Sequence, residues 1–310
     1  MSTGRQTILG AGGVIGKGLA RELSSYAKHV RLVGRNPTNV NPDDELVVAD
    51  LLDSAAVQEA VRESDIAYLV AGLEYKATVW REQWPTIMGN VIEACRRHDV
   101  RLVFFDNVYL YGRVNGPMTE ETSVNPSCAK GEVRAQIAEM LMNEIVAGNV
   151  KALVARAADF YGPEAVTTFV HPMVFEKLRA GKKAAWLCND DVPHSMTFTP
   201  DAVRGTALLG NTDEAYGQVW HLPTHGDAPT GKKFVEMVAA TLNASPRYRV
   251  LKPGMLTLVG FFNPLVRESI ELLYQNQYPY IVDSTKFNQC FFQPTPYREG
   301  IQQTVEWLGR

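Results

Sequence analysis

The chain of 310 residues is long enough for one large α/β domain, or for two domains that share a core, and this length excludes a disulfide-stabilised miniprotein. Its 31 Lys and Arg residues against 34 Asp and Glu residues give a net charge of −3, which favours neither nucleic acid nor an anionic membrane as a partner. No apolar stretch approaches the roughly 20 residues that cross a bilayer, and the four cysteines are too far apart for a zinc site, so we expect a cytoplasmic protein with reduced cysteines.

The first half of the chain alternates short apolar or β-branched runs with amphipathic segments. Strands are predicted, in chain order, over residues 7–9, 30–33, 46–48, 66–70, 102–105 and 152–154. Helices are predicted between them over residues 14–26, 54–62, 84–97 and 132–146, where apolar residues recur at helical spacing. This alternation is typical of an α/β fold with a doubly wound parallel sheet that helices cover.

A glycine-rich turn follows the first predicted strand. Gly10, Gly13 and Gly16 have the spacing GxxGxxG, and Val14 and Ile15 open the helical run that comes next. Such a turn brings backbone N–H groups and the positive end of the helix dipole against a pyrophosphate. We predict that the turn binds a dinucleotide; the alternative is a glycine turn that holds no ligand. Valine at Gly13 or Gly16 is expected to abolish binding and leave a folded protein.

The second predicted strand ends without an acidic residue. In NAD-binding sheets, an Asp or Glu at this place accepts a hydrogen bond from the ribose 2′-hydroxyl. Here the strand runs into Arg35 and Asn36, and a guanidinium can pair with the 2′-phosphate of NADP. We therefore predict NADP as the cofactor and NAD as the second choice; the alternative for Arg35 is a solvated loop residue.

Further motifs occur in an order found in one large family. Asp50 with Leu51 follows the third predicted strand, and Ala71 with Gly72 follows the fourth. The segment 105–112 ends in Tyr-Gly, the segment 156–163 ends in Tyr-Gly-Pro, and a C-terminal pattern comprises Asp283, Ser284, Lys286, Pro294 and Trp307. Over nearly the whole chain, these motifs resemble the extended short-chain dehydrogenase/reductases, the NAD(P)-dependent epimerase/dehydratase family. The resemblance implies a Rossmann fold, with Asp50 and Leu51 beside the adenine and Ala71 and Gly72 beside the cofactor.

The catalytic residues that this resemblance implies are incomplete. Asn107 stands where the family has its catalytic Ser or Thr. The family's Tyr and Lys lie four positions apart on the next helix, but with Lys130 as the lysine the tyrosine place is Pro126, and in the next register it is Ser127. The residue that would exchange a proton with the reacting oxygen is thus absent from its usual place, as in the atypical branch of the family.

Other residues near the predicted fifth strand can polarise a substrate oxygen. Asn107 could donate an amide hydrogen bond, or it could simply form the turn at the strand end. Lys130 could hold the nicotinamide ribose as the family lysine does, or it could be a solvated lysine. Tyr109 and Tyr111 follow the carboxyl end of the strand, where open α/β sheets bind ligands, although a core position is at least as consistent with Tyr111. Asn107, Tyr109 and Lys130 are therefore the catalytic candidates.

Asp159 and Tyr161, in the segment that ends in Tyr-Gly-Pro, are predicted to contact the substrate. Asp159 stands where epimerases commonly have Asn, and a carboxylate there could accept a hydrogen bond from a substrate hydroxyl or act as a base; the alternative is a turn residue. The scattered histidines are predicted to have structural or substrate-lobe roles; they are His171, His194, His221 and His225. The stripe of Trp80, Trp84, Ile87, Met88 and Val91 is predicted to pack in the core or between the two copies of a possible homodimer.

The regular alternation fades after about residue 165, which predicts a smaller, mostly C-terminal lobe. We assign residues 1–168 to a dinucleotide-binding domain to which residues 196–222 return, and residues 169–195 and 223–310 to a small substrate lobe. The sequence favours an NADP(H)-dependent oxidoreductase or epimerase-like enzyme acting on a small carbonyl or hydroxyl substrate. Sugar nucleotides are weakly disfavoured, because the second half lacks a distinctive basic cluster for a diphosphate. The alternative is a non-catalytic NADP(H)-binding protein that senses redox state, which the lost tyrosine favours and the intact second lobe does not.

Overall fold

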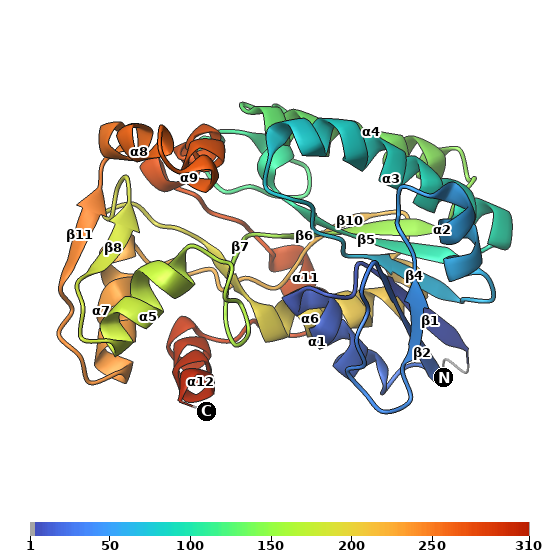
Figure 1. Cartoon of the computed structure of the whole chain (residues 1–310), viewed down its shortest axis with the longest axis horizontal. Coiled ribbons are helices and arrows are strands. Elements are labelled where there is room, and N and C mark those ends of the chain that lie inside the picture. The colour runs from blue at the N-terminus through green and yellow to red at the C-terminus, as the bar shows by residue number, and fades with distance from the viewer. Residues whose placement is uncertain (1–3, 310) are drawn as a thin grey trace. The chain divides into compact units, whose positions relative to one another are not determined.

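The structure is a computed structural model that describes residues 4–309 (Figure 1). The chain divides into two compact units. The first unit comprises the residues up to Leu110 together with Lys130–Arg156 and Ala202–Trp220. The second comprises Tyr111–Ala129, Ala157–Asp201 and the residues from His221 onward. Both units are therefore built from separate stretches of the chain.

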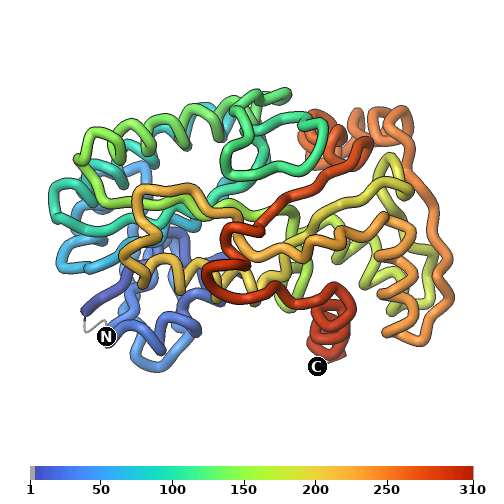
Figure 2. The backbone as a smooth tube through the Cα atoms, turned by 180° about the vertical axis from the view of Figure 1, so that it is seen from behind, coloured from blue at the N-terminus to red at the C-terminus, as the bar shows by residue number. Residues whose placement is uncertain are grey.

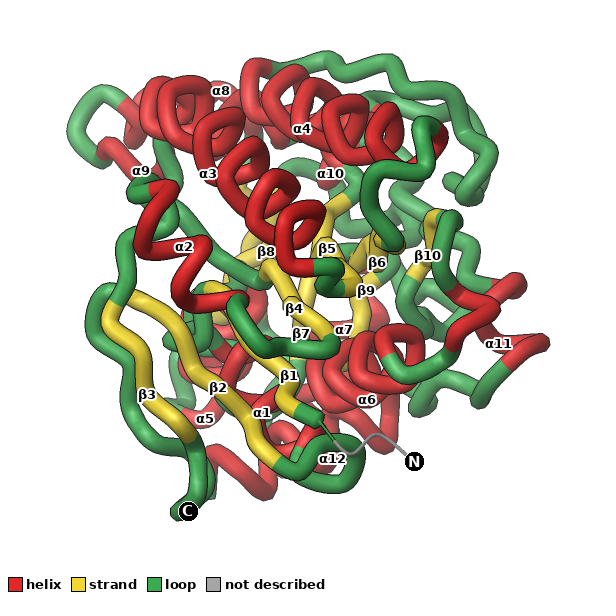
Figure 3. The backbone as a smooth tube through the Cα atoms, turned by 90° about the vertical axis from the view of Figure 1, so that its right-hand side faces the viewer, coloured by secondary structure: helices red, strands yellow, loops and turns green. Residues whose placement is uncertain are grey.

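The first unit contains a seven-stranded sheet in the order β10-β6-β5-β4-β1-β2-β3, and Figure 3 shows the strands side by side in this order. The strands are β1 (Arg5–Leu9), β2 (His29–Gly34), β3 (Glu45–Val48), β4 (Ile66–Leu69), β5 (Arg101–Asn107), β6 (Ala152–Ala157) and β10 (Val219–His221). β1 pairs in parallel with both β2 and β4. β2 is also parallel to β3, and β4 is also parallel to β5. The predicted doubly wound parallel sheet is thereby confirmed.

Helices cover both faces of this sheet. They are α1 (Val14–Leu23), α2 (Ser54–Val61), α3 (Ala77–His98), α4 (Ala129–Val146) and α6 (Thr199–Gly210). Figures 1 and 3 show α2, α3 and α4 on one face and α1 with α6 on the other. Figure 2 shows from behind that α6 lies beside α1, where a Cβ built at Gly18 would lie 2.5 Å from a methyl carbon of Val203. A glycine at this crossing therefore lets the two helices approach closely.

The helix predicted over residues 84–97 and the predicted return of residues 196–222 to the dinucleotide-binding domain both differ in part from the structure. α3 begins at Ala77 rather than Trp84, because the helix accommodates Pro85 in its interior instead of starting near it. The whole stripe Trp80, Trp84, Ile87, Met88 and Val91 is accordingly buried on one helix. β9 (Met196–Phe198) pairs in parallel with β7 (Asp159–Tyr161), outside the seven-stranded sheet, whereas β10 joins that sheet.

The second unit combines two small sheets with short helices. β8 (Ala184–Leu187) pairs in parallel with β11 (Tyr248–Leu251). Its helices are α5 (Glu176–Arg179), α7 (Gly231–Thr241), α8 (Pro253–Gly260), α9 (Pro264–Ser269), α10 (Tyr274–Gln277), α11 (Thr285–Cys290) and α12 (Tyr297–Leu308). Single turns complete the chain: η1 (Tyr109–Tyr111), η2 (His171–Phe175), η3 (Asp213–Ala215) and η4 (Ile270–Leu272). Within residues 4–309, no helix has the length and apolar character needed to cross a bilayer.

Candidate functional site

The glycine turn is fixed to the carboxyl ends of three neighbouring strands. The backbone N–H groups of Gly10 and Ala11 donate to Val33 O at the end of β2, at 2.9 and 3.1 Å. Gly10 has φ +94°, and a Cβ built on it would lie 2.4 Å from Ala71 Cα, just after β4. Only glycine satisfies both conditions, so this position holds the turn against the β4 end.

Open space lies in front of the first turn of α1. Gly13 is the N-cap residue, no side chain within residues 4–309 caps the helix, and its first turn carries no acidic residue. Among the described residues, no heavy atom outside the immediate chain neighbours lies within 4 Å of a Cβ built at Gly12 or Gly13. Uncapped N–H groups with free space before them fit the pyrophosphate of a dinucleotide.

Gly16 has a different role from Gly13. A Cβ built at Gly16 would lie 2.7 Å from Ala11 Cα and 2.8 Å from the Ala11 carbonyl atoms, which are backbone and cannot move aside cheaply. The expectation that valine at Gly16 leaves the fold intact is therefore wrong, because the side chain would collide with the turn itself. Valine at Gly13 meets no such obstacle.

The remaining cofactor candidates lie at the same edge of the sheet. Arg35 is exposed directly after β2, and Asp50 is exposed two residues after the end of β3. Asp50 Oδ1 accepts from Leu52 N at 3.0 Å, while Leu51 is buried and its carbonyl oxygen accepts from Asn90 Nδ2 at 3.0 Å. Ala71 and Gly72 follow β4. The structure thus brings these candidates together with Gly13, Val14 and Ile15 at the carboxyl ends of β1 to β4.

Lys130 is fully buried, with 0% of its surface exposed. Its ammonium lies 4.6 Å from the centroid of the Tyr75 ring, a distance typical of a cation–π contact. The alternative of a solvated lysine is therefore wrong. A buried ammonium in the first turn of α4 is held in place, as a residue that binds a ribose would have to be.

Asn107 and Tyr109 follow each other at the end of β5. Asn107 Oδ1 accepts from Tyr109 N at 3.0 Å and so starts the turn η1, as the alternative interpretation of Asn107 expects. The amide nitrogen is the part of this side chain that could donate to a substrate. The ring of Tyr109 stacks on Trp80 with 6.4 Å between centroids.

A buried carboxylate beside Asn107 was not predicted. Asp106 has a side chain that is 0% exposed, and both Arg134 of α4 and Arg156 of β6 donate to it, the latter at 3.2 Å from Nε. The Arg134 guanidinium also lies 4.6 Å from the Trp84 ring centroid. We call Asp106, Arg134 and Arg156 the arginine cluster. The only sequence signal for it was an acidic residue inside an otherwise apolar strand.

In the second unit, Asp159 pairs with a histidine that sequence reasoning had assigned a structural or substrate-lobe role. Asp159 Oδ2 lies 2.8 Å from His194 Nε2, and the two side chains are 21% and 2% exposed. The ring of His194 stacks on Tyr280 with 4.6 Å between centroids. The two residues are 35 positions apart, and no spacing motif joins them. The pairing arises because β7 and β9 are neighbouring strands and His194 precedes β9.

Tyr111 and Tyr161 lie in the core of the second unit, each 1% exposed. The Tyr111 hydroxyl is 2.9 Å from His221 Nε2, and the Tyr161 ring stacks on Tyr297 with 5.5 Å between centroids. Burial raises the pKa of the Tyr161 hydroxyl well above its ordinary value. Neither ring has the exposure that a substrate contact needs, so the structure assigns Tyr161 to packing rather than to the substrate role expected of it.

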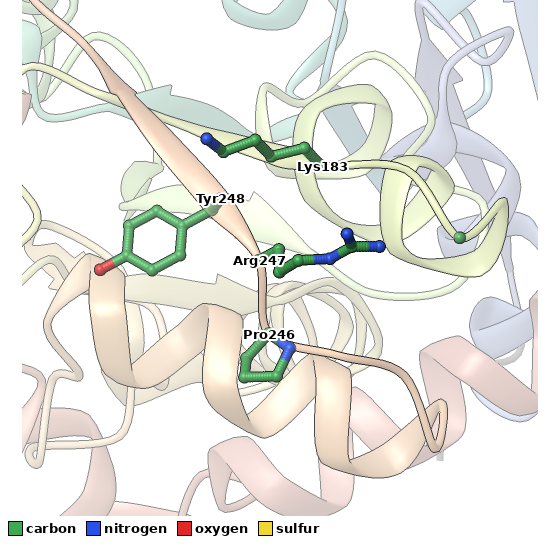
Figure 4. A pocket seen from close by; sticks show the side chains of 5 residues that line it. Lys183, Pro246, Arg247 and Tyr248 are labelled. Carbon is green, nitrogen blue, oxygen red and sulfur yellow. The ribbon is translucent and has the colours of Figure 1, made fainter.

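A hollow on the second unit is lined by residues that are not among the site candidates described above. It is lined by Gly181, Lys183, Pro246, Arg247 and Tyr248, beside the pairing of β8 with β11 (Figure 4). Figure 4 shows the side chains of Lys183 and Arg247 extending in opposite directions. The two cations therefore do not converge on one anion.

Comparison with known proteins places these features in context. The model of the NAD dependent epimerase/dehydratase family matches residues 7–222. Uronate dehydrogenase of Pseudomonas putida is 32% identical over 105 residues, which are 33% of this chain and 39% of the relative. The chain therefore aligns with less than half the length of that relative.

Solved structures with low sequence identity share the fold. The dTDP-glucose 4,6-dehydratase of Streptomyces venezuelae, solved with NAD, has a TM-score of 0.81 at 17% identity over 98% of this chain and 97% of its own. The UDP-glucuronic acid 4-epimerase of Bacillus cereus, also solved with NAD, has a TM-score of 0.79 at 15% identity over 98% of both chains.

Proposed function

The chain belongs to the NAD dependent epimerase/dehydratase family, and on this premise we propose that it binds a nicotinamide dinucleotide on the first unit and transforms a small hydroxyl or carbonyl substrate. The observation that carries the proposal is the uncapped start of α1 with open space before Gly12 and Gly13. In this proposal the first unit is the dinucleotide-binding domain and the second is the substrate lobe. A homodimer and a cytoplasmic location remain predictions.

Arg35 supports NADP as the preferred cofactor. The two residues directly after β2 are Arg35 and Asn36, neither of which is a carboxylate that would accept from a ribose 2′-hydroxyl, and Arg35 is exposed there. The solved relatives named above hold NAD, so the preference depends on this one residue. When bound, the dinucleotide supplies or accepts a hydride.

The chemistry proposed is that of an oxidoreductase or an epimerase-like enzyme. Asn107 would donate to the reacting oxygen, Tyr109 would supply a hydroxyl, and Lys130 would hold the ribose. No tyrosine stands four or three positions before Lys130, so this set differs from the usual Tyr-x-x-x-Lys pair. The likeness to uronate dehydrogenase supports a sugar acid as one substrate class to test first.

Dinucleotide titration of Gly13→Val tests the site itself. We expect NADPH affinity to fall at least 100-fold with little change in Tm, because the side chain occupies the space before the helix and collides with nothing. Gly226→Val is the matched control, since a Cβ there also meets open space but lies in the second unit. Binding by Gly13→Val that equals the parent would show that the dinucleotide lies elsewhere.

Calorimetric comparison of NADP(H) with NAD(H) tests the preference. We expect NADP(H) to bind about tenfold more tightly, and Arg35→Ala to remove most of that difference, since a charge-assisted pair contributes roughly 1.5–3 kcal/mol. Equal affinities in the parent protein would refute the role given to Arg35 and leave NAD as the cofactor.

Turnover separates this proposal from the redox-sensing alternative. Sugar acids, aldoses and nucleotide sugars can be screened with each dinucleotide by absorbance of the reduced nicotinamide. Turnover of any of them supports an enzyme. Tight NADPH binding with no turnover, together with a partner protein that distinguishes NADP⁺ from NADPH, would favour the sensor.

A further inference from the structure

Polar atoms without partners gather in one short segment of the second unit. Among the described residues, Tyr274 Oη, Gln275 Nε2 and Asn276 Nδ2 are each buried and lack a hydrogen-bond partner. Gln275 is 4% exposed and Asn276 is 7% exposed. A buried donor without a hydrogen-bond partner typically lowers the stability of the fold by roughly 1–3 kcal/mol, so three such donors in consecutive residues need an explanation.

The backbone of this segment is firmly tied. Asn276 N donates to Leu273 O at 3.0 Å, Gln275 O is 3.1 Å from His194 Nδ1, and Asn276 O accepts from Asn189 N at 3.1 Å. The missing hydrogen bonds are therefore confined to side chains on a well-anchored backbone. Loose packing does not account for them.

The side chain of Gln275 lies near the hydroxyl of Tyr274. Burial raises the pKa of the Tyr274 hydroxyl well above its ordinary value, and nearby Cys128 and Asp159 add to the effect. Ser127 and Gln275 lie near enough to this hydroxyl to lower its pKa in part, although the hydroxyl has hydrogen-bond geometry to neither. The hydroxyl thus keeps its proton at neutral pH and lies beside Gln275 and Asp159.

His194 lies between Asp159 and the backbone of Gln275. Its Nδ1 is 3.1 Å from the carbonyl oxygen of Gln275, and its Nε2 is 2.8 Å from Asp159 Oδ2. This carboxylate oxygen of Asp159 therefore already has a partner, and it leaves the donors of Tyr274 and Gln275 for a ligand.

The three side-chain atoms without partners can all donate a hydrogen bond. An amide nitrogen only donates, and a protonated phenol donates as well as accepts. Their complement is an oxygen that accepts and does not donate. We propose that Tyr274 and Gln275 bind a carboxylate or carbonyl oxygen of the substrate; this deepens the proposed function and rests on it.

Binding of matched sugars tests this subsite in the full-length protein saturated with its dinucleotide. The probes are D-glucuronate, D-glucuronamide and D-glucose, measured by titration calorimetry. We expect glucuronate to bind at least tenfold more tightly than glucose. Glucuronamide binding as well as glucuronate would identify a carbonyl oxygen as sufficient, and glucuronate binding alone would identify a carboxylate.

Variants of the two donors complete the test. Gln275→Glu turns the donor into a carboxylate and is expected to weaken glucuronate binding tenfold or more, while Gln277→Glu two residues along serves as the control. Tyr274→Phe is expected to weaken it about tenfold as well, with a Tm equal to or above that of the parent, because it removes an unsatisfied buried hydroxyl. Tyr278→Phe, at an exposed tyrosine, is its control.

Several outcomes would overturn the subsite. One is glucuronate and glucuronamide binding no better than glucose, or not at all, to protein that does hold the dinucleotide. Another is Gln275→Glu that binds glucuronate as the parent does. A Tm loss in Tyr274→Phe beyond that of Tyr278→Phe would mean that the hydroxyl has a structural partner. Failure to hold any dinucleotide would instead refute the proposed function, and it is seen before any sugar is added.

Discussion

The arginine cluster of the first unit and the Asp159–His194 pair of the second unit each contain an aspartate held by basic side chains, but they differ in what surrounds them. Asp106 is 0% exposed and receives hydrogen bonds from two guanidinium groups. Asp159 is 21% exposed, and beside it lie donors that no described residue satisfies. A cluster whose hydrogen bonds are complete supports the fold, whereas one with spare donors is prepared for a ligand.

The largest effect is expected at Asp106. Asp106→Ala would leave Arg134 and Arg156 buried without their shared carboxylate, and breaking a buried pair in this way typically costs about 3–5 kcal/mol. The free energy of unfolding from urea denaturation measures the loss. Asp50→Ala, at an exposed aspartate of the same unit, is the control. A loss below about 1 kcal/mol at Asp106 would contradict the structural role of the cluster.

Lys130 is a further charged side chain to set beside the arginine cluster and the Asp159–His194 pair. It is a buried residue of the first unit, and its ammonium lies over an aromatic ring. If it is catalytic, Lys130→Ala should reduce turnover about 100-fold or more, as should Asn107→Ala and Tyr109→Phe, since a lost proton donor typically costs 10²- to 10⁴-fold. The kcat of each variant measures this once a substrate is known. NADPH binding should survive in the Asn107 and Tyr109 variants and weaken in the Lys130 variant. Unchanged turnover in all three would refute the site while leaving the enzyme class intact.

The smallest effect on stability is expected at Asp159. Asp159→Asn keeps an oxygen that can accept from His194 and removes only the charge, in a side chain that is partly exposed. We expect a loss of about 1 kcal/mol by thermal denaturation, well below that at Asp106. A loss as large as that of Asp106→Ala would erase the distinction between the two clusters and make the Asp159–His194 pair structural.

The sheet of the first unit could be predicted because its strands are buried on both faces and alternate with amphipathic helices. The glycine turn could be predicted equally well, because Gly10, Gly13 and Gly16 lie close together in the chain. Gly13 and Gly16 nevertheless have different neighbours, which only the packing against Ala11 shows.

The second unit was much less predictable. His194 lies 35 positions from Asp159, and Tyr274 lies far beyond Ser127, so no local spacing joins the groups that meet there. Tyr161 occurs in a motif that resembles a substrate segment, yet its ring is enclosed by Phe198, Phe234 and Tyr297. Aromatic burial of this kind depends on long-range packing that a motif does not encode.

The bond from Ala129 N to Glu271 Oε2 joins residues 142 positions apart, and this sets an order of events during protein synthesis. At about 5–20 residues per second, a ribosome needs roughly 7–28 s to add the stretch between them. Throughout that interval the first turn of α4, which carries Lys130, is already made but waits for the carboxylate that will cap it. We therefore expect the nascent chain to acquire its completed α4 late, and ribosome-bound chains that stop before Glu271 to expose this turn to proteases.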